Sequence, residues 1–347
     1  MRIAQVSPLY ESVPPRFYGG TERVVSYLTE ELVQAGHEVV LFASGDSGTS
    51  ATLVPGCEAS LRTEFRCIDP AAFHLLLIEE VLRREDEFDV IHAHIDYYGF
   101  ALARRSRVPV VSTLHGRCDL WEQTFLFPEF RECALVSISN SQRRPVPAAN
   151  WIDTVYHGLP RRLYTPGESP EDYLVYIGRI SQEKNVESAI AIARKCGLPL
   201  KIAAKVDKAD LSYFEQKIRP RLKDPLVEFL GEVGDAEKNE LIGSALAFLH
   251  PADWPEPFGL TLIEAMACGT PVIARRRGAI PEVVDDGITG FVFEEDDEAV
   301  QLVRNLLPSF DRKGCRQHFE KRFLADRMAR DYVNVYQAVL EQQPAGK

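Results

Sequence analysis

Two glutamates stand eight residues apart in a stretch that is typical of a loop running into a helix. The stretch is EPFGLTLIEAMACGTP, and its two acids are Glu256 and Glu264. Gly259 lets the backbone come close to a ligand, and the free N–H groups of a first helical turn favour a phosphate. One carboxylate from the loop and one from the helix could hold the hydroxyls of a sugar. The alternative is a simple helix cap with one solvated glutamate.

A second stretch, GRISQEKN, follows a predicted strand and carries two cations. Arg179 and Lys184 are five residues apart in it. At a strand exit, a guanidinium and an ammonium at this spacing can both reach one diphosphate. The alternative is a surface loop with two solvated cations. The position of the stretch upstream of the two glutamates favours the diphosphate site.

The first half of the chain holds two weaker motifs. Gly19 and Gly20 stand between the first predicted strand and helix, where two glycines make a tight turn that can approach an anion. His115 ends another predicted strand, and its alternative is an ordinary packed or surface histidine. The sequence has neither a GxGxxG fingerprint nor a P-loop, which disfavours NAD and ATP sites.

We predict no metal site. His92 and His94 lie on one face of a predicted strand and could form a metal pair, but no third ligand is evident at a workable spacing. We therefore interpret both histidines as strand-end residues that line the ligand site.

Short apolar runs alternate with helical patterns through most of the chain, which is typical of parallel α/β sheets. We predict helices from Val24 to Val33, from Asp69-Pro70 onward, and over 186–195 and 313–341. The predicted strands are 2–7, 38–43, 89–94, 109–115, 134–139, 153–156, 174–177, 200–204, 227–230, 247–250 and 271–274.

The linker at 158–170 is rich in proline and glycine and indicates a domain boundary. We predict a first doubly wound, Rossmann-like domain over 1–164, a second over 165–324, and a C-terminal segment over 325–347 that packs back on the first. Such domains bind ligands at the carboxyl ends of their strands, so the expected site is a cleft between the two.

The bulk composition agrees with an enzyme of two domains. The 347 residues fit two cores of about 150 residues each, and the net charge of −11 disfavours a broad nucleic-acid surface. No apolar run approaches the roughly 20 residues that span a bilayer, although peripheral membrane contact stays open. The start of the chain resembles a buried strand, and seven cysteines without a C-x-x-C pair indicate reduced thiols. We therefore expect a cytoplasmic protein.

Together these motifs resemble those of the retaining glycosyltransferases of family 4. Glu256 and Glu264 match the E-x7-E signature of that family, and Arg179 and Lys184 match its G-R-x-x-x-x-K segment. The stretch IPEVVDDGITGF at 280–291 resembles a segment that closes the second domain. The resemblance covers nearly the whole chain and implies the GT-B fold, in which two Rossmann-like domains face each other across a cleft.

The sequence also departs from this family pattern. Ala204 and Ala279 stand where the family often has glycine, and His157 stands where Asn is common. These departures concern details of the nucleotide pocket and leave the class unchanged.

The resemblance implies a role for each candidate residue. Glu256 would contact the donor sugar and Glu264 the ribose, while Arg179 and Lys184 would neutralise the leaving diphosphate. His115 would lie near the transferred sugar. The donor would also meet the backbone of Phe258, Gly259, Leu260 and Thr261 and the glycine loop of Gly19 and Gly20. The acceptor would lie on the first domain, where strand ends and loops carry Glu11, Arg16, Asp96 and Tyr97.

The implied activity is transfer of a hexose from a nucleotide sugar to a small-molecule, saccharide or lipid-linked acceptor. The PPRFYGG stretch at 14–20 resembles a bacterial glucosyltransferase subgroup, so UDP-glucose is the expected donor and no other cofactor is expected. The sequence lacks an Asp-x-Asp motif, which favours a metal-independent, front-face substitution. Two alternatives remain: a nucleotide-sugar 2-epimerase of the same fold, and an inactive protein that binds a sugar nucleotide.

Overall fold

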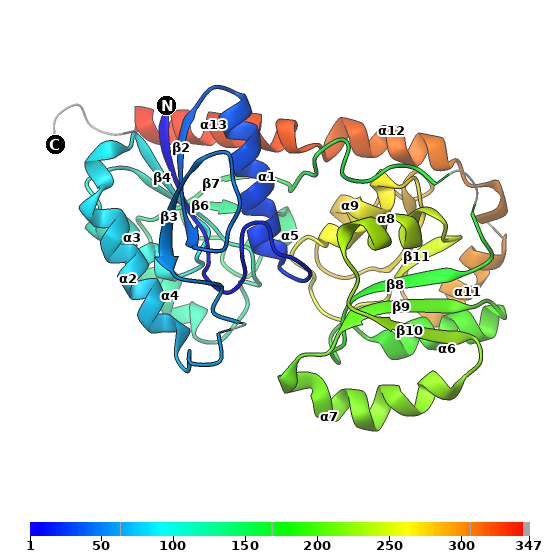
Figure 1. Ribbon diagram of the computed structural model, residues 1–347. Helices are drawn as coiled ribbons and strands as arrows, with labels where there is room; N and C mark the ends of the chain where they lie inside the picture. Colours follow the sequence, from blue (N-terminus) through cyan, green and yellow to red (C-terminus); the bar gives the residue numbers. More distant parts are fainter. Residues whose placement is uncertain (63, 168–169, 306, 343–347) are drawn as a thin grey trace. The chain divides into compact units, whose positions relative to one another are not determined.

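The computed structural model describes residues 1–62, 64–167, 170–305 and 307–342, and it divides into two compact units (Figure 1). Unit 1 comprises Met1–Gly158 and the chain from Ala325 onward, and unit 2 comprises Leu159–Leu324. Each unit is built on one parallel sheet with flanking helices, so the predicted α/β class is confirmed. Within the predicted linker and C-terminal segment, 168–169 and 343–347 lie outside the described residues.

The boundary falls between Gly158 and Leu159, six residues before the predicted one. Leu159 belongs to unit 2 because its N–H donates to the carbonyl of Phe323 at 2.8 Å and its backbone forms a β-bridge with Leu324. Tyr164 is likewise fully buried in unit 2. These contacts place Leu159 and Tyr164 of the predicted linker in unit 2.

Unit 1 contains seven parallel strands in the order β3-β2-β1-β4-β5-β6-β7. Its strands are β1 (Arg2–Val6), β2 (Glu38–Ser44), β3 (Thr52–Cys57), β4 (Val90–Ala93), β5 (Val110–Thr113), β6 (Ala134–Ser137) and β7 (Trp151–Thr154). Its helices are α1 (Gly20–Gln34), α2 (Pro70–Arg83), the short 3₁₀ turn η1 (Glu85–Glu87), α3 (Tyr98–Arg105), α4 (Gln123–Glu129), α5 (Asn140–Arg143) and α13 (Ala325–Glu341). The Asp69 side chain caps α2 by accepting the N–H of Ala71 at 3.0 Å, as Asp69-Pro70 predicted.

Unit 2 contains six parallel strands in the order β10-β9-β8-β11-β12-β13. Its strands are β8 (Leu174–Arg179), β9 (Leu200–Lys205), β10 (Val227–Gly231), β11 (Ala247–His250), β12 (Val272–Arg275) and β13 (Gly290–Phe293). Its α-helices are α6 (Val186–Cys196), α7 (Leu211–Tyr213), α8 (Asp235–Gly243), α9 (Leu260–Ala267), α10 (Ile280–Val283), α11 (Asp296–Asn305) and α12 (Arg312–Arg322). Shorter turns are η2 (Lys208–Asp210), η3 (Phe214–Ile218), η4 (Arg219–Lys223) and η5 (Leu307–Ser309).

Two strands and one helix break differ from the sequence prediction. The edge strand β3, TLVPGC, is half-exposed and contains Pro55 and Gly56, so it lacks an apolar run. The short strand β13 was predicted only as part of a closing segment. The helical pattern at 313–341 is two helices, because the buried residues Phe323 and Leu324 separate α12 from α13.

Helix α13 packs on unit 1, and its two buried tyrosines hydrogen-bond to the sheet. Tyr336 Oη lies 2.7 Å from His92 Nδ1 and 3.1 Å from Gln5 Nε2, while Tyr332 Oη lies 3.0 Å from Thr113 Oγ1.

The connections of each sheet run in opposite directions from one central pair of strands. This reversal falls between β1 and β4 in unit 1, and between β8 and β11 in unit 2. Ligands of doubly wound sheets bind outside the carboxyl ends of the strands at such points. A ligand site is therefore expected at the loops after β8 and β11 in unit 2, and at those after β1 and β4 in unit 1.

Candidate functional site

A buried ion pair joins the loops that follow β8 and β11 in unit 2. Lys184 Nζ lies 2.5 Å from Glu256 Oε2 and 4.6 Å from the centre of the Trp254 ring. The indole N–H of Trp254 donates to the same carboxylate oxygen at 2.9 Å, and His250 Nε2 approaches it to 3.4 Å. The structure thus brings together the predicted Lys184 and Glu256.

The surroundings of Glu256 keep it ionised. Burial by itself raises the pKa of this carboxyl, but the Lys184 ammonium and the contact with His250 outweigh burial and hold the pKa well below its usual range. Burial lowers the pKa of His250, so this histidine is neutral near pH 7. The cluster therefore contains one cation and one anion.

The loop that carries Glu256 is fixed by close backbone contacts. Gly278 has φ +58, and a Cβ there would come within 2.3 Å of the backbone N and O of Glu256. The next N–H, from Ala279, donates to the Glu256 carbonyl at 2.8 Å. Only glycine fits at 278, and it lets the loop after β12 pack closely against the backbone of Glu256.

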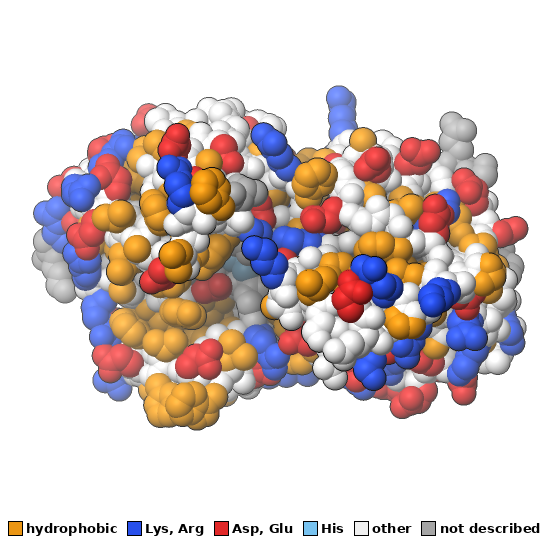
Figure 2. Space-filling model, turned by 60° about the horizontal axis from the view of Figure 1, so that its bottom comes forward, with side chains coloured by type: hydrophobic (Ala, Val, Ile, Leu, Met, Phe, Trp, Pro, Cys, Tyr) orange, Lys and Arg blue, Asp and Glu red, His pale blue; other side chains and the backbone are white. Residues whose placement is uncertain are grey.

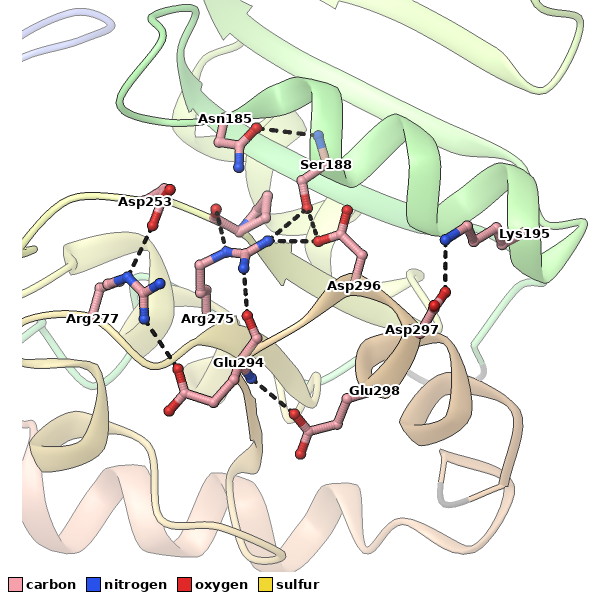
Figure 3. A network of polar contacts seen from close by, with 11 residues as sticks. Asn185, Ser188, Lys195, Asp253, Arg275, Arg277, Glu294, Asp296, Asp297 and Glu298 are labelled. Carbon is pink, nitrogen blue, oxygen red and sulfur yellow. Dashed lines mark hydrogen bonds and ion pairs between the residues drawn. The ribbon is translucent and has the colours of Figure 1, made fainter.

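Two arginines at the end of β12 and just beyond it support the same loop (Figure 3). Arg275 is buried and joins the carbonyl of Pro251 to Asp296 of α11, at 3.4 and 2.6 Å. Arg277 pairs with Asp253 at 2.9 Å and with Glu294 at 3.1 Å. These contacts anchor the start of the loop, whose end carries Trp254 and Glu256.

The backbone next to Lys184 is also constrained. Asn185 adopts a left-handed conformation with φ +50, and its side chain caps α6 by accepting the N–H of Ser188 at 3.4 Å. Such a conformation costs free energy in a residue other than glycine, so it is kept only where surrounding contacts impose it. This constraint fixes the backbone next to Lys184, whose side chain pairs with Glu256.

Arg179 does not share the partners of Lys184. Its guanidinium lies among three acids, at 3.5 Å from Asp210, 3.8 Å from Glu183 and 3.9 Å from Asp207. Its Nε is buried and makes no hydrogen bond to the described residues. The Nε atom is the one that lies nearest Asp210, so the three acids partly compensate the charge of Arg179.

Glu264 is paired with a lysine that the sequence analysis did not single out. It is 2% exposed, and its Oε1 lies 2.9 Å from Nζ of Lys238, which also lies 3.5 Å from Asp235. Its Oε2 is buried and has no hydrogen-bond partner within the described chain. The structure therefore leaves one oxygen of this carboxylate unsatisfied, a costly arrangement that a ligand hydroxyl would relieve.

Helix α9 begins where the sequence predicted a phosphate-binding turn. Gly259 precedes it with φ +90, and Leu260 and Thr261 of the first turn are partly exposed. The Phe258 side chain instead packs in the interior against Phe323, with ring centres 6.1 Å apart. Phe258 can thus contribute its backbone to a ligand site but not its ring.

Four histidines lie together in unit 1 at the carboxyl ends of its strands. His92, His94 and His157 are buried, and His115 is partly buried. His94 Nδ1 lies 2.9 Å from His115 Nε2, and the His115 ring stacks on His157 at 5.4 Å. Burial lowers the pKa of His115 to about 3 and holds those of the other three well below 6.5.

The ring nitrogens of His92 and His94 face protein partners. His92 contacts Tyr336 and Thr113, each at 2.7 Å, and His94 contacts Gln5 at 2.8 Å besides His115. Within the described ranges, no three His, Cys, Asp or Glu residues are grouped so as to hold a metal ion.

The other candidates of unit 1 lie in two loops. A Cβ at Gly19 would come within 3.3 Å of the Glu11 side chain, and Glu11 pairs with Arg62 at 3.0 Å. Asp96, which follows β4, accepts the N–H of His115 at 3.3 Å. Gly20, Arg16 and Tyr97 are exposed. The structure thus joins Glu11 to the glycine loop and Asp96 to His115.

Four residues next to these candidates escaped the sequence analysis as members of the site. Trp254 stands two residues before Glu256, so its proximity in sequence could have identified it. Lys238 lies in the acid-rich stretch before α9, where an isolated positive charge in a helix could have identified it. Gln5 and Tyr336 carried no signal, because a polar residue in a strand or a tyrosine in a helix is ordinary.

The buried histidines predict that acid destabilises unit 1. In the unfolded chain they take up protons near pH 6.5, whereas in the folded chain their pKa values are lower. Their contribution to stability is therefore complete above pH 6.5 and is lost as pH falls below it. We expect the urea concentration at the unfolding midpoint to be lower at about pH 5.5 than at about pH 7.5.

Two variants make this pH prediction specific. His157→Asn removes one of the four groups and should reduce the pH dependence. Burial raises the pKa of Glu22 to about 7, which favours the folded state on acidification, so Glu22→Gln should make the acid loss steeper. A midpoint that is the same at both pH values in the Glu22→Gln variant would contradict the low pKa values of the buried histidines.

The surface of unit 1 carries several exposed apolar side chains, and Figure 2 shows hydrophobic residues gathered on its face. The most exposed are Phe65, Ile68, Trp121 and Phe125. Among the described residues, no helix has both the length and the apolar character that crossing a bilayer requires.

Two family models together match most of the chain. The chain matches the family described as "Glycosyltransferase Family 4" over residues 18–176 and the one described as "Glycosyl transferases group 1" over residues 166–320. Glycogen synthase of Mycobacterium tuberculosis strain H37Rv is 29% identical over 344 residues, which span 84% of this chain and 81% of that protein.

Solved structures show the same fold. AviGT4, a glycosyltransferase involved in Avilamycin A biosynthesis, has a TM-score of 0.77 at 24% identity and covers 99% of each chain. The Anabaena protein HepE in complex with UDP and glucose has a TM-score of 0.75 at 17% identity, covering 97% of this chain and 100% of that one.

Proposed function

Because the chain belongs to the glycosyltransferases of family 4 and has their GT-B fold, we propose that it is a retaining hexosyltransferase that uses a nucleotide sugar. The observation that carries the proposal is the Lys184–Glu256 pair, which lies at the switch point of unit 2 beside the first turn of α9. A cation and an anion at this place suit the two ends of a nucleotide sugar. The ammonium suits the diphosphate, and the carboxylate suits the sugar hydroxyls.

We propose a front-face substitution at the anomeric carbon. The bond from this carbon to the diphosphate oxygen breaks, and the acceptor oxygen bonds on the same face. The acceptor hydroxyl gives its proton to the departing phosphate oxygen. Lys184, Arg179 and the N–H groups at the start of α9 stabilise the charge that develops on the diphosphate. Because Glu256 is held through Oε2 by Lys184 and Trp254, it suits electrostatic stabilisation better than nucleophilic attack.

Glucose is the proposed sugar and UDP the proposed nucleotide. HepE, which shares the fold, binds UDP and glucose, and this supports the choice. A thermal-shift panel of nucleotide sugars tests it, because a ligand that binds the folded protein raises the apparent stability. UDP-glucose should give the largest shift, and a larger shift with a GDP- or ADP-sugar would change the assignment.

Product analysis separates this function from its two alternatives. A transferase should slowly release glucose and UDP from UDP-glucose in the absence of acceptor. Formation of the C2 epimer from the donor alone would instead identify an epimerase, and binding without any turnover would identify an inactive binding protein. The paired Lys184 and Glu256 favour turnover.

We propose that the acceptor binds on unit 1, where aromatic rings adjoin Asp96. Tyr97 is 46% exposed and lies 5.3 Å from Tyr98, which stacks on His74 at 5.3 Å. Such rings suit the apolar face of a small aglycone or a sugar.

All seven cysteines are free thiols, which supports a cytoplasmic location.

Activity should not depend on a divalent metal. The proposal assigns charge neutralisation to Lys184, Arg179 and backbone N–H groups. We therefore expect donor hydrolysis to survive dialysis and excess EDTA with less than about twofold loss. Complete loss that Mg²⁺ or Mn²⁺ restores would contradict this part of the mechanism.

A further inference from the structure

A continuous chain of hydrogen bonds links α13 to His115 within unit 1. Gln5 Nε2 lies 3.1 Å from Tyr336 Oη, and Gln5 Oε1 lies 2.8 Å from His94 Nε2. His94 Nδ1 in turn lies 2.9 Å from His115 Nε2. Tyr336, Gln5 and His94 are each at most 1% exposed. Water is therefore excluded, and each group must be satisfied by the next one in the chain.

The positions of the protons follow from what each atom can do. A neutral imidazole has one N–H donor and one acceptor nitrogen, and a carboxamide oxygen only accepts. His94 Nε2 faces the Gln5 oxygen, so it must carry the proton of His94. His94 Nδ1 is then an acceptor, and the proton between the two rings must belong to His115 Nε2. His115 Nδ1 is left with a lone pair.

We propose that Tyr336, Gln5 and His94 are positioning residues that hold His115 as its Nε2–H tautomer. His115 Nδ1 then offers a lone pair, and a bound group must donate a hydrogen bond to it. A sugar hydroxyl can do this, whereas a carbonyl or phosphate oxygen cannot. This last step rests on the proposed function, but the tautomer does not. Helix α13, far away in the sequence, thus sets the hydrogen-bonding character of a residue at the site.

The same heavy atoms also allow a complete reversal. If the Gln5 carboxamide were turned over, its NH₂ would donate to His94 Nε2, and His94 would carry its proton on Nδ1. His115 would then carry its proton on Nδ1. Tyr336 would donate to Gln5 and not to His92. Because every link reverses together, one measurement on His115 decides between the two arrangements.

The test is ¹⁵N NMR of the full chain labelled at histidine, with long-range ¹H–¹⁵N correlations at neutral pH. We expect His115 Nε2 to resonate as a protonated nitrogen and Nδ1 as an unprotonated one. Gln5→Glu keeps an acceptor facing His94 and should leave this pattern unchanged. Gln5→Met removes the acceptor, so the two His115 signals should move toward an average of the tautomers. A wild-type His115 protonated on Nδ1 would overturn the proposal.

Matched variants separate positioning from packing. Tyr336→Phe removes the hydroxyl that orients Gln5 and should shift His115 toward the tautomer average. Tyr332→Phe removes the other buried hydroxyl of α13, which contacts Thr113, and should not. Equal effects of both variants, or none from Tyr336→Phe, would overturn the role of Tyr336 even if both proteins fold normally.

Ligand titration separates this inference from the proposed function. UDP-glucose, but not UDP, should shift the His115 Nδ1 signal. A protein that binds no nucleotide but shows the Nε2–H tautomer of His115 would overturn the proposed function and support the positioning role of Tyr336, Gln5 and His94. A protein that binds UDP-glucose and shows the reversed tautomer would overturn that positioning role alone.

Discussion

Lys184→Ala should lower the kcat of UDP-glucose turnover by about 10²-fold or more without unfolding the protein. The ammonium is proposed to stabilise the departing diphosphate, and it is also the counter-ion of the buried Glu256 at 2.5 Å. Truncation therefore removes one interaction of the transition state and leaves a carboxylate without its cation. Steady-state kinetics, with circular dichroism to verify the fold, measures the effect.

Lys195→Ala is the matched control for this loss. Lys195 lies on α6 in the same unit, but it is exposed and pairs with Asp297 on the surface at 2.6 Å. Its removal should change kcat less than about twofold, since exposed ion pairs contribute little to stability. If Lys184→Ala folds and retains full kcat, the diphosphate binds elsewhere.

Lys184→Ala should also change the acid side of the pH profile of kcat. In the wild type, burial raises the pKa of Glu256, but Lys184 and His250 hold it well below the usual range. Without the ammonium, burial is opposed less and the pKa of Glu256 rises. Protonation then begins at a higher pH, so kcat should decline earlier on acidification than in the wild type.

Glu256→Gln should lower kcat by about 10²-fold and leave the binding of free UDP intact or slightly tighter. The proposed partner of Glu256 is the sugar, which gains positive charge during transfer, so a neutral amide helps the transition state less. Free UDP lacks the transferred hexose. The substitution also releases Lys184 from its carboxylate, and the ammonium can then interact more strongly with phosphate. Kinetics and calorimetry with UDP measure the two effects separately.

Glu264→Gln is the comparison that makes this assignment testable. Its proposed partner is the ribose, whose contacts change little between ground and transition states. This variant should therefore raise the donor KM and weaken UDP binding, with kcat within about tenfold of the wild type. Loss of UDP binding in Glu256→Gln, together with a pure kcat loss in Glu264→Gln, would reverse the two roles.

Much of this fold could be predicted from local patterns. The central strands β4 and β5 are buried along their whole length, so their apolar runs marked them, and Asp69-Pro70 marked the start of α2. The edge strands β3 and β13 escaped because a short or half-exposed strand needs no continuous apolar run. The break between α12 and α13 escaped because the apolar residues Phe323 and Leu324 also fit a helical pattern.

Local patterns singled out candidate residues for the site, but they did not indicate which of these residues pair. Strand ends and turn residues identified Arg179, Lys184 and Glu256, because these features are local. The contact of Lys184 with Glu256, 72 positions further along the chain, depends on the fold and on a glycine at 278 that allows close backbone contact. Lys238 and Trp254 became partners of the two glutamates through the same tertiary contacts, which no local pattern encodes.

Helix α13 gives the two units different histories during synthesis. Unit 2 is one continuous stretch, and all its residues exist once Leu324 has been made. Tyr336 is synthesised 331 residues after Gln5, which takes roughly 15–65 s at ordinary rates of translation. Throughout that interval the histidines that α13 will cover face water or a chaperone. Synthesis that stops before Ala325 should therefore yield a chain whose second unit can fold while its first remains open, a target for proteolysis confined to the first half.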